Sequence, residues 1–532
     1  MNFLKEKSIY FILLLTFLFF IQGVVQLPVM DRDEARFSTA SKTMLETKNF
    51  VDIKMQDEVR YKKPVGIYWL QSISNYFFGN PPYDEIWVYR LPSFFGVILS
   101  IFLIYNFVRK EYDFKGAILC VCFLILPIIT ISEVHQAKTD GFLFLTVVAS
   151  NLIVMKGLKD NFLNLKNKIF FWFISAFGVL IKGPIIFIFT ILPLFVLCIF
   201  KKKNFFKVIW TIRGFLLFLL VSIPWFIAIT IISDGLFWHE SAINDLFNKV
   251  RSGQESHGFP PGYYLTLMLL MFWPGVIFVP ILLKKIFKDF KLSFLKEDYQ
   301  IFTFFWFVVP FILYELIPTK LPHYIFPSYA ALSIILPSII GKNNLYGIIH
   351  KFSFFILCFY PICFLTAQIF VVYEYSNIDV SLWLITFLGI CVLVIMIVNF
   401  FQKNIFRLIS SACVFQSLVY FSAVYYLIPK LETLWISEKI NSFIDNKINN
   451  VDKVLLYGFN EPSLTFLTSH KAIKKNIIDY DLKKDEKILY IVTSKHSSFI
   501  RENSFNEFKL IEKFEGFNYS QGKKVEINFF EN

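Results

Sequence analysis

A run of charged residues, RDEARF at 32–37, directly follows the first hydrophobic segment of the chain. Asp33 and Arg36 are three residues apart, so a helix that begins near Asp31 would place a carboxylate and a guanidinium near one face. A carboxylate in this position can take a proton from an attacking hydroxyl group, and a guanidinium can bind a phosphate. A helix-capping carboxylate with a surface ion pair is the alternative interpretation of the same spacing.

A second cluster, RYKKPVGIYWLQ at 60–71, contains Lys62 and Lys63 directly before a proline. Two adjacent ammonium groups favour an anion such as a phosphate, although interfacial lysines also extend their charged ends towards water. Asp140 begins a later apolar segment, where it either caps a helix or belongs to an active site. Lys182 stands between two apolar runs, and because an unpaired buried ammonium is costly, we expect it to be functional.

Two later segments also concentrate polar side chains. FWHESAINDLFNKVRSGQESHGFPPGYY contains Arg251 and His257 as candidate phosphate-binding residues, although a single histidine is more often structural. TKLPHYIFPSYAAL contains His323 and Tyr324 at the outer end of an apolar segment, where anchoring at the membrane interface is the alternative. The patterns GxxxxGK[ST], HExxH, GxSxG and paired CxxC do not occur, so nucleotide hydrolysis, zinc proteolysis and the common serine-hydrolase chemistry lack support.

The elements that must position these residues are expected to be membrane helices. Hydrophobic residues form 56% of the 532 residues, aromatic residues form 19%, and the mean hydropathy is +0.57. About 20 apolar residues cross the hydrocarbon layer. Windows of that length predict a polytopic α-helical membrane protein with about thirteen spans, near 8–28, 87–107, 115–132, 141–157, 168–182, 184–200, 212–232, 263–283, 300–317, 323–341, 352–373, 381–401 and 406–428.

Lysines and arginines predict the orientation of these spans. Basic clusters such as Lys201 to Lys203 occur in alternate loops, which the positive-inside rule places in the cytoplasm. The N-terminus is then cytoplasmic, with the first segment retained as an anchor, and the candidate site residues face outward. The formal net charge of +13 is mostly this topology signal, and we expect no nucleic-acid partner.

The chain is predicted to have two domains, a membrane domain over 1–429 and a small soluble α/β domain over 430–532 on the outer side. In the outer loop 29–86, two amphipathic helices are expected on the membrane surface, one at 65–79 and one carrying Phe37, Ala40, Met44 and Leu45. Strands are predicted near 453, 487, 508 and 523.

All seven cysteines lie in predicted spans, so disulfides and thiolate metal sites are not expected.

The order and spacing of six motifs resemble a known family. The motifs are RDEARF, RYKKPVGIYWLQ, the Asp140 segment, IKGP, PWF at 224–226 and KLPHYIFPSYAAL, and the match extends over residues 1–340. They resemble the GT-C membrane glycosyltransferases, in the branch of protein O-mannosyltransferases and the lipid A aminoarabinose transferase. The resemblance implies transfer of a sugar from a polyprenyl-phosphate carrier to a lipid, lipopolysaccharide or protein acceptor on the periplasmic face of the bacterial inner membrane.

The resemblance also implies roles for single residues. Asp33 matches the family's essential acidic residue and Asp140 its second acidic position. The positions near the carrier phosphate correspond to Arg36, Lys63, Lys182 and, as a phosphate-side tyrosine, Tyr324. The lipid A transferases have a glutamate where this chain has Lys62, which replaces a possible metal ligand by a cation. No cofactor is therefore predicted with certainty, and a divalent metal is doubtful.

Two other functions remain as alternatives. A transporter or flippase of a lipid-linked substrate would place charged groups and broken helices near the bilayer midplane, usually in repeated halves, and no such repeat is evident. An oligosaccharide polymerase or glycan ligase would use the same kind of carrier as the transferase. Neither the sugar nor the acceptor is encoded in a motif of this chain.

Overall fold

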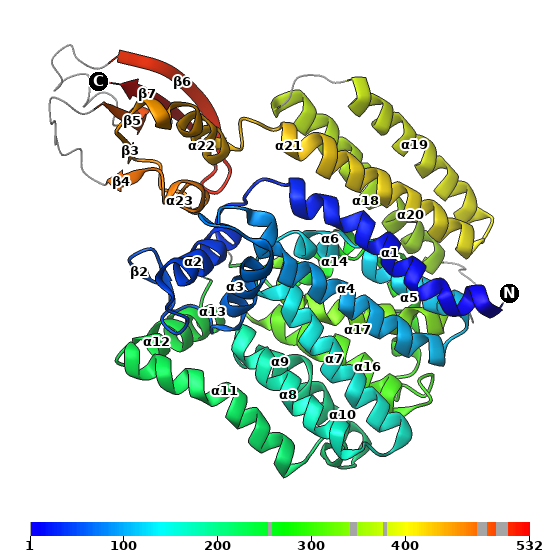
Figure 1. Cartoon of the computed structure of the whole chain (residues 1–532). Coiled ribbons are helices and arrows are strands. Elements are labelled where there is room, and N and C mark those ends of the chain that lie inside the picture. The colour runs from blue at the N-terminus through cyan, green and yellow to red at the C-terminus, as the bar shows by residue number, and fades with distance from the viewer. Residues whose placement is uncertain are drawn as a thin grey trace.

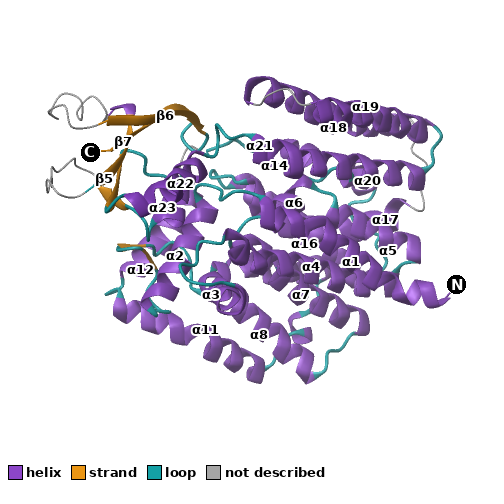
Figure 2. Ribbon diagram, turned by 45° about the horizontal axis from the view of Figure 1, so that its top comes forward, coloured by secondary structure: helices purple, strands orange, loops and turns teal. Residues whose placement is uncertain are grey.

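The computed structural model describes residues 2–253, 258–340, 348–375, 380–475, 487–495 and 509–531. Figure 1 shows a large body of helices with a small domain of strands and short helices beside it, and Figure 2 shows that the longer strands belong to this small domain. The polytopic helical class with a small C-terminal α/β domain is therefore confirmed.

Each of the thirteen predicted spans coincides with a helix or with successive helices. Among the described residues, eight helices are long and apolar enough to cross a membrane, or up to ten if two bent pairs each count as one span. The count of thirteen is thus not confirmed. The helices of the body are α1 (Asn2–Gln26), α4 (Ile86–Glu111), α5 (Phe114–Ile125), α6 (Ile128–Val134), α7 (Thr139–Asp160), α8 (Leu165–Lys182), α9 (Ile185–Phe189), α10 (Ile191–Lys201), α11 (Ile212–Ile232), α14 (Tyr263–Met271), η3 (Gly275–Phe278), α15 (Val279–Lys288), α16 (Asp298–Leu316), η4 (Pro322–Ile325), α17 (Phe326–Ile340), α18 (Ile348–Tyr375), α19 (Val380–Phe401), α20 (Ile405–Phe421), η5 (Ser422–Leu427) and α21 (Ile428–Lys430).

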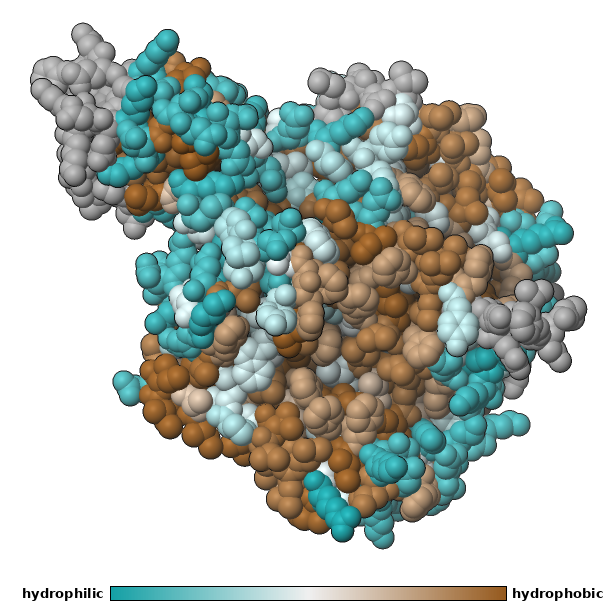
Figure 3. All heavy atoms as spheres, viewed as in Figure 1, coloured by the Kyte–Doolittle hydropathy of each residue, from teal (hydrophilic) through white to brown (hydrophobic). Residues whose placement is uncertain are grey.

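The surface of the helical body carries an apolar band. In Figure 3 hydrophobic residues cover a broad band across the helices, whereas hydrophilic residues gather on the small domain and, at the opposite side, near the N-terminus. Helix α11 illustrates the band, because its apolar side chains Ile212, Leu216, Leu220 and Ile227 are all exposed. Exposed apolar residues of this kind suit a lipid environment.

Helices α4 and α7 approach each other closely at two glycines. A Cβ atom on Gly96 would lie 2.5 Å from the carbonyl oxygen of Gly141, and one on Gly141 would lie 2.8 Å from the Cα atom of Ser93. Small residues let membrane helices pack this tightly. The crossing fixes the first turn of α7, and with it Asp140, against α4.

The loop between α1 and α4, the predicted first outer loop, contains α2 (Asp33–Thr47), the short hairpin of β1 (Lys54–Met55) and β2 (Glu58–Val59), and α3 (Gly66–Phe78). Helix α2 was expected on the membrane surface, but apart from the half-buried Arg36 it is buried in the protein from Glu34 to Leu45, polar side chains included. It packs between α3 and α23 (Pro462–Thr468) of the small domain. Helix α3 exposes apolar side chains at its C-terminal end, among them Tyr76 and Phe77.

The small domain contains helices on one five-stranded sheet. Its elements are α22 (Ile436–Lys447), η6 (Ile448–Asn450), β3 (Lys453–Tyr457), α23 (Pro462–Thr468), β4 (Ile473–Lys475), β5 (Ile488–Thr493), β6 (Lys509–Asn518) and β7 (Lys523–Glu531). The strand order is β4-β3-β5-β7-β6. Strand β3 is parallel to β4 and β5, whereas β7 is antiparallel to β5 and β6. The four predicted strands correspond to β3, β5, β6 and β7.

Candidate functional site

A cavity of about 480 Å³ lies where the loop between α1 and α4 meets the ends of the membrane helices. Its lining comes from the start of α2, the segment before α3, the ends of α7 and α8 that meet there, η4, and the segment of α12 (Leu236–Trp238), η2 (His239–Phe247) and α13 (Asn248–Arg251). Eight of the predicted site residues line it: Asp33, Arg36, Lys62, Lys63, Asp140, Lys182, His323 and Tyr324.

The other two predicted residues are not in the cavity wall. Arg251 is exposed at the end of α13 and does not line the cavity. His257 lies outside the residues that the structure describes.

Three charged lining residues were not among the predicted site residues: Arg60, Asp245 and Lys249. Arg60 precedes the predicted lysine pair by two residues, and Asp245 and Lys249 have the i,i+4 spacing of a helical ion pair. These were the local signals that could have identified them.

Asp140 and Lys182 form an ion pair in the cavity wall. The Lys182 Nζ atom lies 2.6 Å from Asp140 Oδ1, and the nearby His323 Nε2 lies 3.9 Å from the other carboxylate oxygen. The ammonium also lies 5.4 Å from the centre of the Tyr324 ring. Asp140 of α7 is thus the counter-ion of Lys182 across the helix pair, and the functional role expected for Lys182 stays a prediction.

A second ion pair network joins the loop before α3 to η2 and α13. Asp245 accepts hydrogen bonds from Lys63 and, at 2.7 Å, from Lys249. Burial by itself would raise the pKa of the Asp245 carboxyl group. The two ammonium groups have the larger, opposite effect and lower the pKa to about 2. Asp245 is therefore ionised and holds two cations at the cavity.

Asp33 is half-buried at the first position of α2 and faces the same cavity. Among the described residues, none donates a hydrogen bond to its carboxylate. Burial raises the pKa of Asp33, but nearby cationic groups outweigh this and leave the pKa below its usual value; they are His323 when protonated, Lys138, Arg60 and Lys63. The carboxylate is thus ionised and its oxygens face the cavity.

Lys138 extends the network behind the cavity. Its Nζ atom lies 2.9 Å from Glu133 Oε1 and 3.5 Å from His323 Nδ1. The pair of Lys138 and Glu133 therefore supports His323 from the side opposite Asp140.

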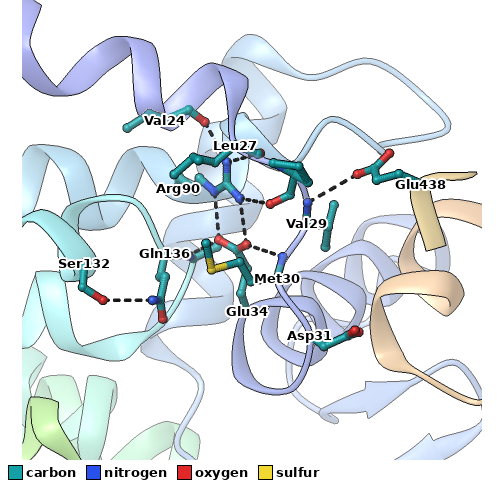
Figure 4. A network of polar contacts seen from close by, with 12 residues as sticks. Val24, Leu27, Val29, Met30, Asp31, Glu34, Arg90, Ser132, Gln136 and Glu438 are labelled. Carbon is teal, nitrogen blue, oxygen red and sulfur yellow. Dashed lines mark hydrogen bonds and ion pairs between the residues drawn. The ribbon is translucent and has the colours of Figure 1, made fainter. Parts of the chain in front are cut away.

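A buried ion pair between α2 and α4 positions the start of α2 (Figure 4). Arg90 donates hydrogen bonds to both carboxylate oxygens of Glu34, each at 2.8 Å, and to three carbonyl oxygens at the end of α1 and just after it, those of Val24, Leu27 and Pro28. Glu34 also accepts from the backbone N–H groups of Ala137 and Met30. The network joins the segments that carry Asp33 and Asp140.

The cavity combines positive charge with an apolar wall. Six cationic side chains line it against three carboxylates, the cations being Arg36, Arg60, Lys62, Lys63, Lys182 and Lys249. Apolar side chains complete the lining, among them Val179, Ile185, Phe187, Ile188, Phe218 and Phe226. A ligand with an anionic head and a hydrocarbon tail matches both parts. Among the described residues, no three His, Cys, Asp or Glu side chains are grouped so that they could hold a metal ion.

Sequence comparison relates the chain to sugar transferases. Residues 62–227 match the family described as dolichyl-phosphate-mannose-protein mannosyltransferase. An uncharacterised protein of Aquifex aeolicus (strain VF5) is 28% identical over 339 residues, which cover 64% of this chain and 74% of that protein. The undecaprenyl phosphate-alpha-4-amino-4-deoxy-L-arabinose arabinosyl transferase 2 of Proteus mirabilis (strain HI4320) is 23% identical over 309 residues, which cover 57% of this chain. The match spans about half, 54%, of that transferase.

Comparison of structures gives the same relationship for the fold. ArnT from Cupriavidus metallidurans bound to undecaprenyl phosphate superposes with a TM-score of 0.73 at 13% identity, covering 98% of both chains. Its apo state gives the same TM-score at 14% identity. The fold is thus that of ArnT. The chain is similar to ArnT in fold and to the protein mannosyltransferase family over residues 62–227, which confirms the resemblance that its motifs predicted.

Proposed function

We propose that this protein is an integral membrane glycosyltransferase that moves a sugar from a polyprenyl-phosphate carrier to lipid A or a related envelope acceptor. The observation that carries the proposal is the cavity that Asp33 lines together with six cationic side chains and an apolar wall. The named activity of the Proteus mirabilis relative and the undecaprenyl phosphate bound by the Cupriavidus metallidurans ArnT support this carrier.

The cationic residues of the cavity act on the carrier's phosphate. The carrier's phosphate binds among the cations, with Lys63 and Lys182 each held in place by a carboxylate. When the bond between the sugar's anomeric carbon and the phosphate oxygen breaks, the electron pair stays on the polyprenyl phosphate. The cations are already in place when this negative charge begins to grow, and they stabilise it in the transition state. This lowers the barrier. Tyr324 and His323 complete this wall of the cavity.

Asp33 acts on the acceptor. If the acceptor is a hydroxyl group, its oxygen forms the new bond to the anomeric carbon and its proton passes to the Asp33 carboxylate as general base. The depressed pKa of Asp33 keeps it ionised and ready for this role. If the acceptor is an ionised phosphate, no proton is transferred and Asp33 orients it. Asp140 contributes through its ion pair with Lys182.

The proposed location is the inner membrane of a bacterium, with the cavity and the C-terminal domain on the periplasmic side. The first outer loop, α12 and the small domain lie on one side of the apolar band (Figures 1 and 3). The predicted cytoplasmic N-terminus lies at the opposite side. A lipid-linked donor in the outer leaflet would reach the cavity along its apolar wall.

The test compares cells that carry the wild type, no copy, Asp33→Asn or Asp234→Asn. Asp234 is an exposed aspartate outside the cavity lining, so it is the matched control. Mass spectrometry of envelope lipids and lipopolysaccharide should show a sugar-sized mass that disappears without the gene and in Asp33→Asn, but persists in Asp234→Asn. Persistence of that mass in Asp33→Asn would refute the role of Asp33. No change in any strain would favour transport of a lipid-linked substrate.

A further inference from the structure

The C-terminal domain contacts the segment that carries Asp33. Asp31 Oδ1 accepts a hydrogen bond from the backbone N–H of Ser463 at 3.0 Å, and the Asp31 N–H donates to the Tyr519 hydroxyl at 2.7 Å. The Arg32 guanidinium donates to the carbonyl oxygen of Ser520. The two residues before Asp33 are therefore both bound to the small domain, one to α23 and both to the turn between β6 and β7.

Contacts on either side of this pair continue the interface. Before it, the Val29 N–H donates to Glu438 of α22 at 3.3 Å, and Figure 4 shows this bond on the side of the segment away from Arg90. After it, the buried Lys42 of α2 donates to the carbonyl oxygen of Phe466 at 3.1 Å. Phe466 also packs in an apolar cluster with Val29. The interface thus extends from the end of α1 along α2.

The part of the small domain that receives the loop is stiffened internally. Glu461, the residue before α23, accepts hydrogen bonds from Asn518 and Gln521 at 2.7 Å each and from the Ser520 hydroxyl at 2.7 Å. This carboxylate connects α23 to the β6–β7 turn, so that the partners of Asp31 and Arg32 form one rigid surface. A rigid partner can impose a backbone geometry on the loop.

The loop needs such a partner, because its backbone is unfavourable just before Asp33. Arg32 has φ 69° and ψ −111°, a combination that non-glycine residues rarely adopt. Such residues are energetically costly and persist only where their surroundings hold them. The Arg32 side chain is bound to Ser520 and its neighbour Asp31 to Ser463, so the small domain supplies contacts on both residues.

We propose that the C-terminal domain is a positioning element of the active site, which holds the segment 29–37 and thereby sets the direction of the Asp33 carboxylate. Asp31 is the positioning residue at the centre of this contact. The inference rests on the proposed function in that Asp33 is taken as the group that meets the acceptor. A misplacement of about 1 Å at a reacting group can cost about 10²-fold in rate. The small domain would therefore control turnover without touching substrate.

The first experiment measures docking directly, without any substrate. Hydrogen–deuterium exchange of the full-length protein in detergent is compared for the wild type, Asp31→Ala, Asp31→Asn and Asp452→Ala. Asp31→Ala removes the acceptor of the Ser463 N–H, whereas the asparagine oxygen keeps it. Asp452 also accepts a backbone hydrogen bond, from Lys487 at 2.8 Å, but inside the small domain. We expect faster exchange in segments 29–37 and 459–470 for Asp31→Ala alone.

The second experiment measures transfer with an undecaprenyl-phosphate sugar as donor. Asp31→Ala should lower kcat by about tenfold to a hundredfold and leave the donor KM within twofold, while Asp31→Asn and Asp452→Ala remain close to the wild type. Unchanged exchange in Asp31→Ala, or faster exchange with an unchanged kcat, would overturn the proposal. An inactive wild type would refute the proposed donor instead, and the exchange result would still decide whether the domain holds the loop.

Discussion

Replacing Arg90 by methionine should strongly destabilise the protein, because the guanidinium connects three segments in the interior. Arg90 is completely buried and donates five hydrogen bonds, two to Glu34 and three to carbonyl oxygens of residues 24–28. Methionine keeps much of the volume and none of the donors. Removing one partner of a buried ion pair typically costs about 3–5 kcal/mol, since the other charge remains buried without compensation.

The expected cost can be divided by a double-mutant cycle. In the variant Arg90→Met with Glu34→Gln, no uncompensated carboxylate remains, and the glutamine oxygen can still accept from one of the N–H groups that Glu34 bonds. The double variant should therefore be more stable than Arg90→Met alone, by about 1–3 kcal/mol, the usual penalty of an unpaired buried polar group. It should remain less stable than the wild type, because the carbonyl oxygens at the end of α1 have lost their donor.

The assay is the thermal unfolding of the full-length protein in detergent, followed by the amount of monodisperse protein that remains after heating. Arg213→Met is the matched control, since this arginine is exposed at the start of α11. The control should unfold with the wild type, the double variant at a lower temperature, and Arg90→Met at the lowest. If Arg90→Met unfolded with the control, or if the two substitutions were simply additive, the buried pair would not organise this region.

Three further predictions concern the cavity and the interface. Lys182→Met removes a cation and leaves Asp140 without its 2.6 Å partner, so the initial transfer rate should fall by about 10²-fold or more; a rate near the wild type would contradict its role. Asp245→Asn removes the charge that neutralises Lys63, so a prenyl phosphate should bind more tightly in an equilibrium binding assay, whereas weaker binding would mean that the carboxylate mainly orients the lysine. Burial raises the pKa of Asp31 from 3.8 to about 6. The protonated form of Asp31 therefore stabilises the interface fully below pH 3.8, and this stabilisation is lost as the pH rises through about 6. Exchange of segment 29–37, corrected for the intrinsic pH dependence, should therefore accelerate between about pH 5 and 7 in the wild type and not in Asp31→Asn.

The sequence indicated most of the charged residues that line the cavity, but not how they pair. Lys62, Lys63 and Lys182 are conspicuous because charged residues are rare beside apolar runs in this chain. The partner of Lys63 is Asp245, 182 residues away, and no local pattern connects them. Glu34 and Arg90 were missed for the same reason, since their contact joins two helices 56 residues apart.

The strands of the small domain and the positions of the helices could also be predicted, because both depend on the local period and length of apolar segments. The buried environment of α2 could not be predicted in this way. Its apolar residues recur at helical spacing, which favours a surface helix, yet polar residues such as Lys42 and Ser41 are buried too. They are satisfied by Phe466 and Gln71, which come from α23 and α3. Buried polar side chains need hydrogen-bond partners, and here these partners come from elements that only the tertiary structure brings together.

The pairing of cations with carboxylates has a consequence for the proposed reaction. Asp140 and Asp245 are the counter-ions of Lys182 and Lys63, and the two ion pairs hold these side chains in place before the donor binds. Six cations against three carboxylates still leave an excess of positive charge. The donor is a phosphodiester with one negative charge, and the departing polyprenyl phosphate carries about two. The excess charge therefore binds the departing phosphate more strongly than the intact donor, which is the difference that lowers a barrier.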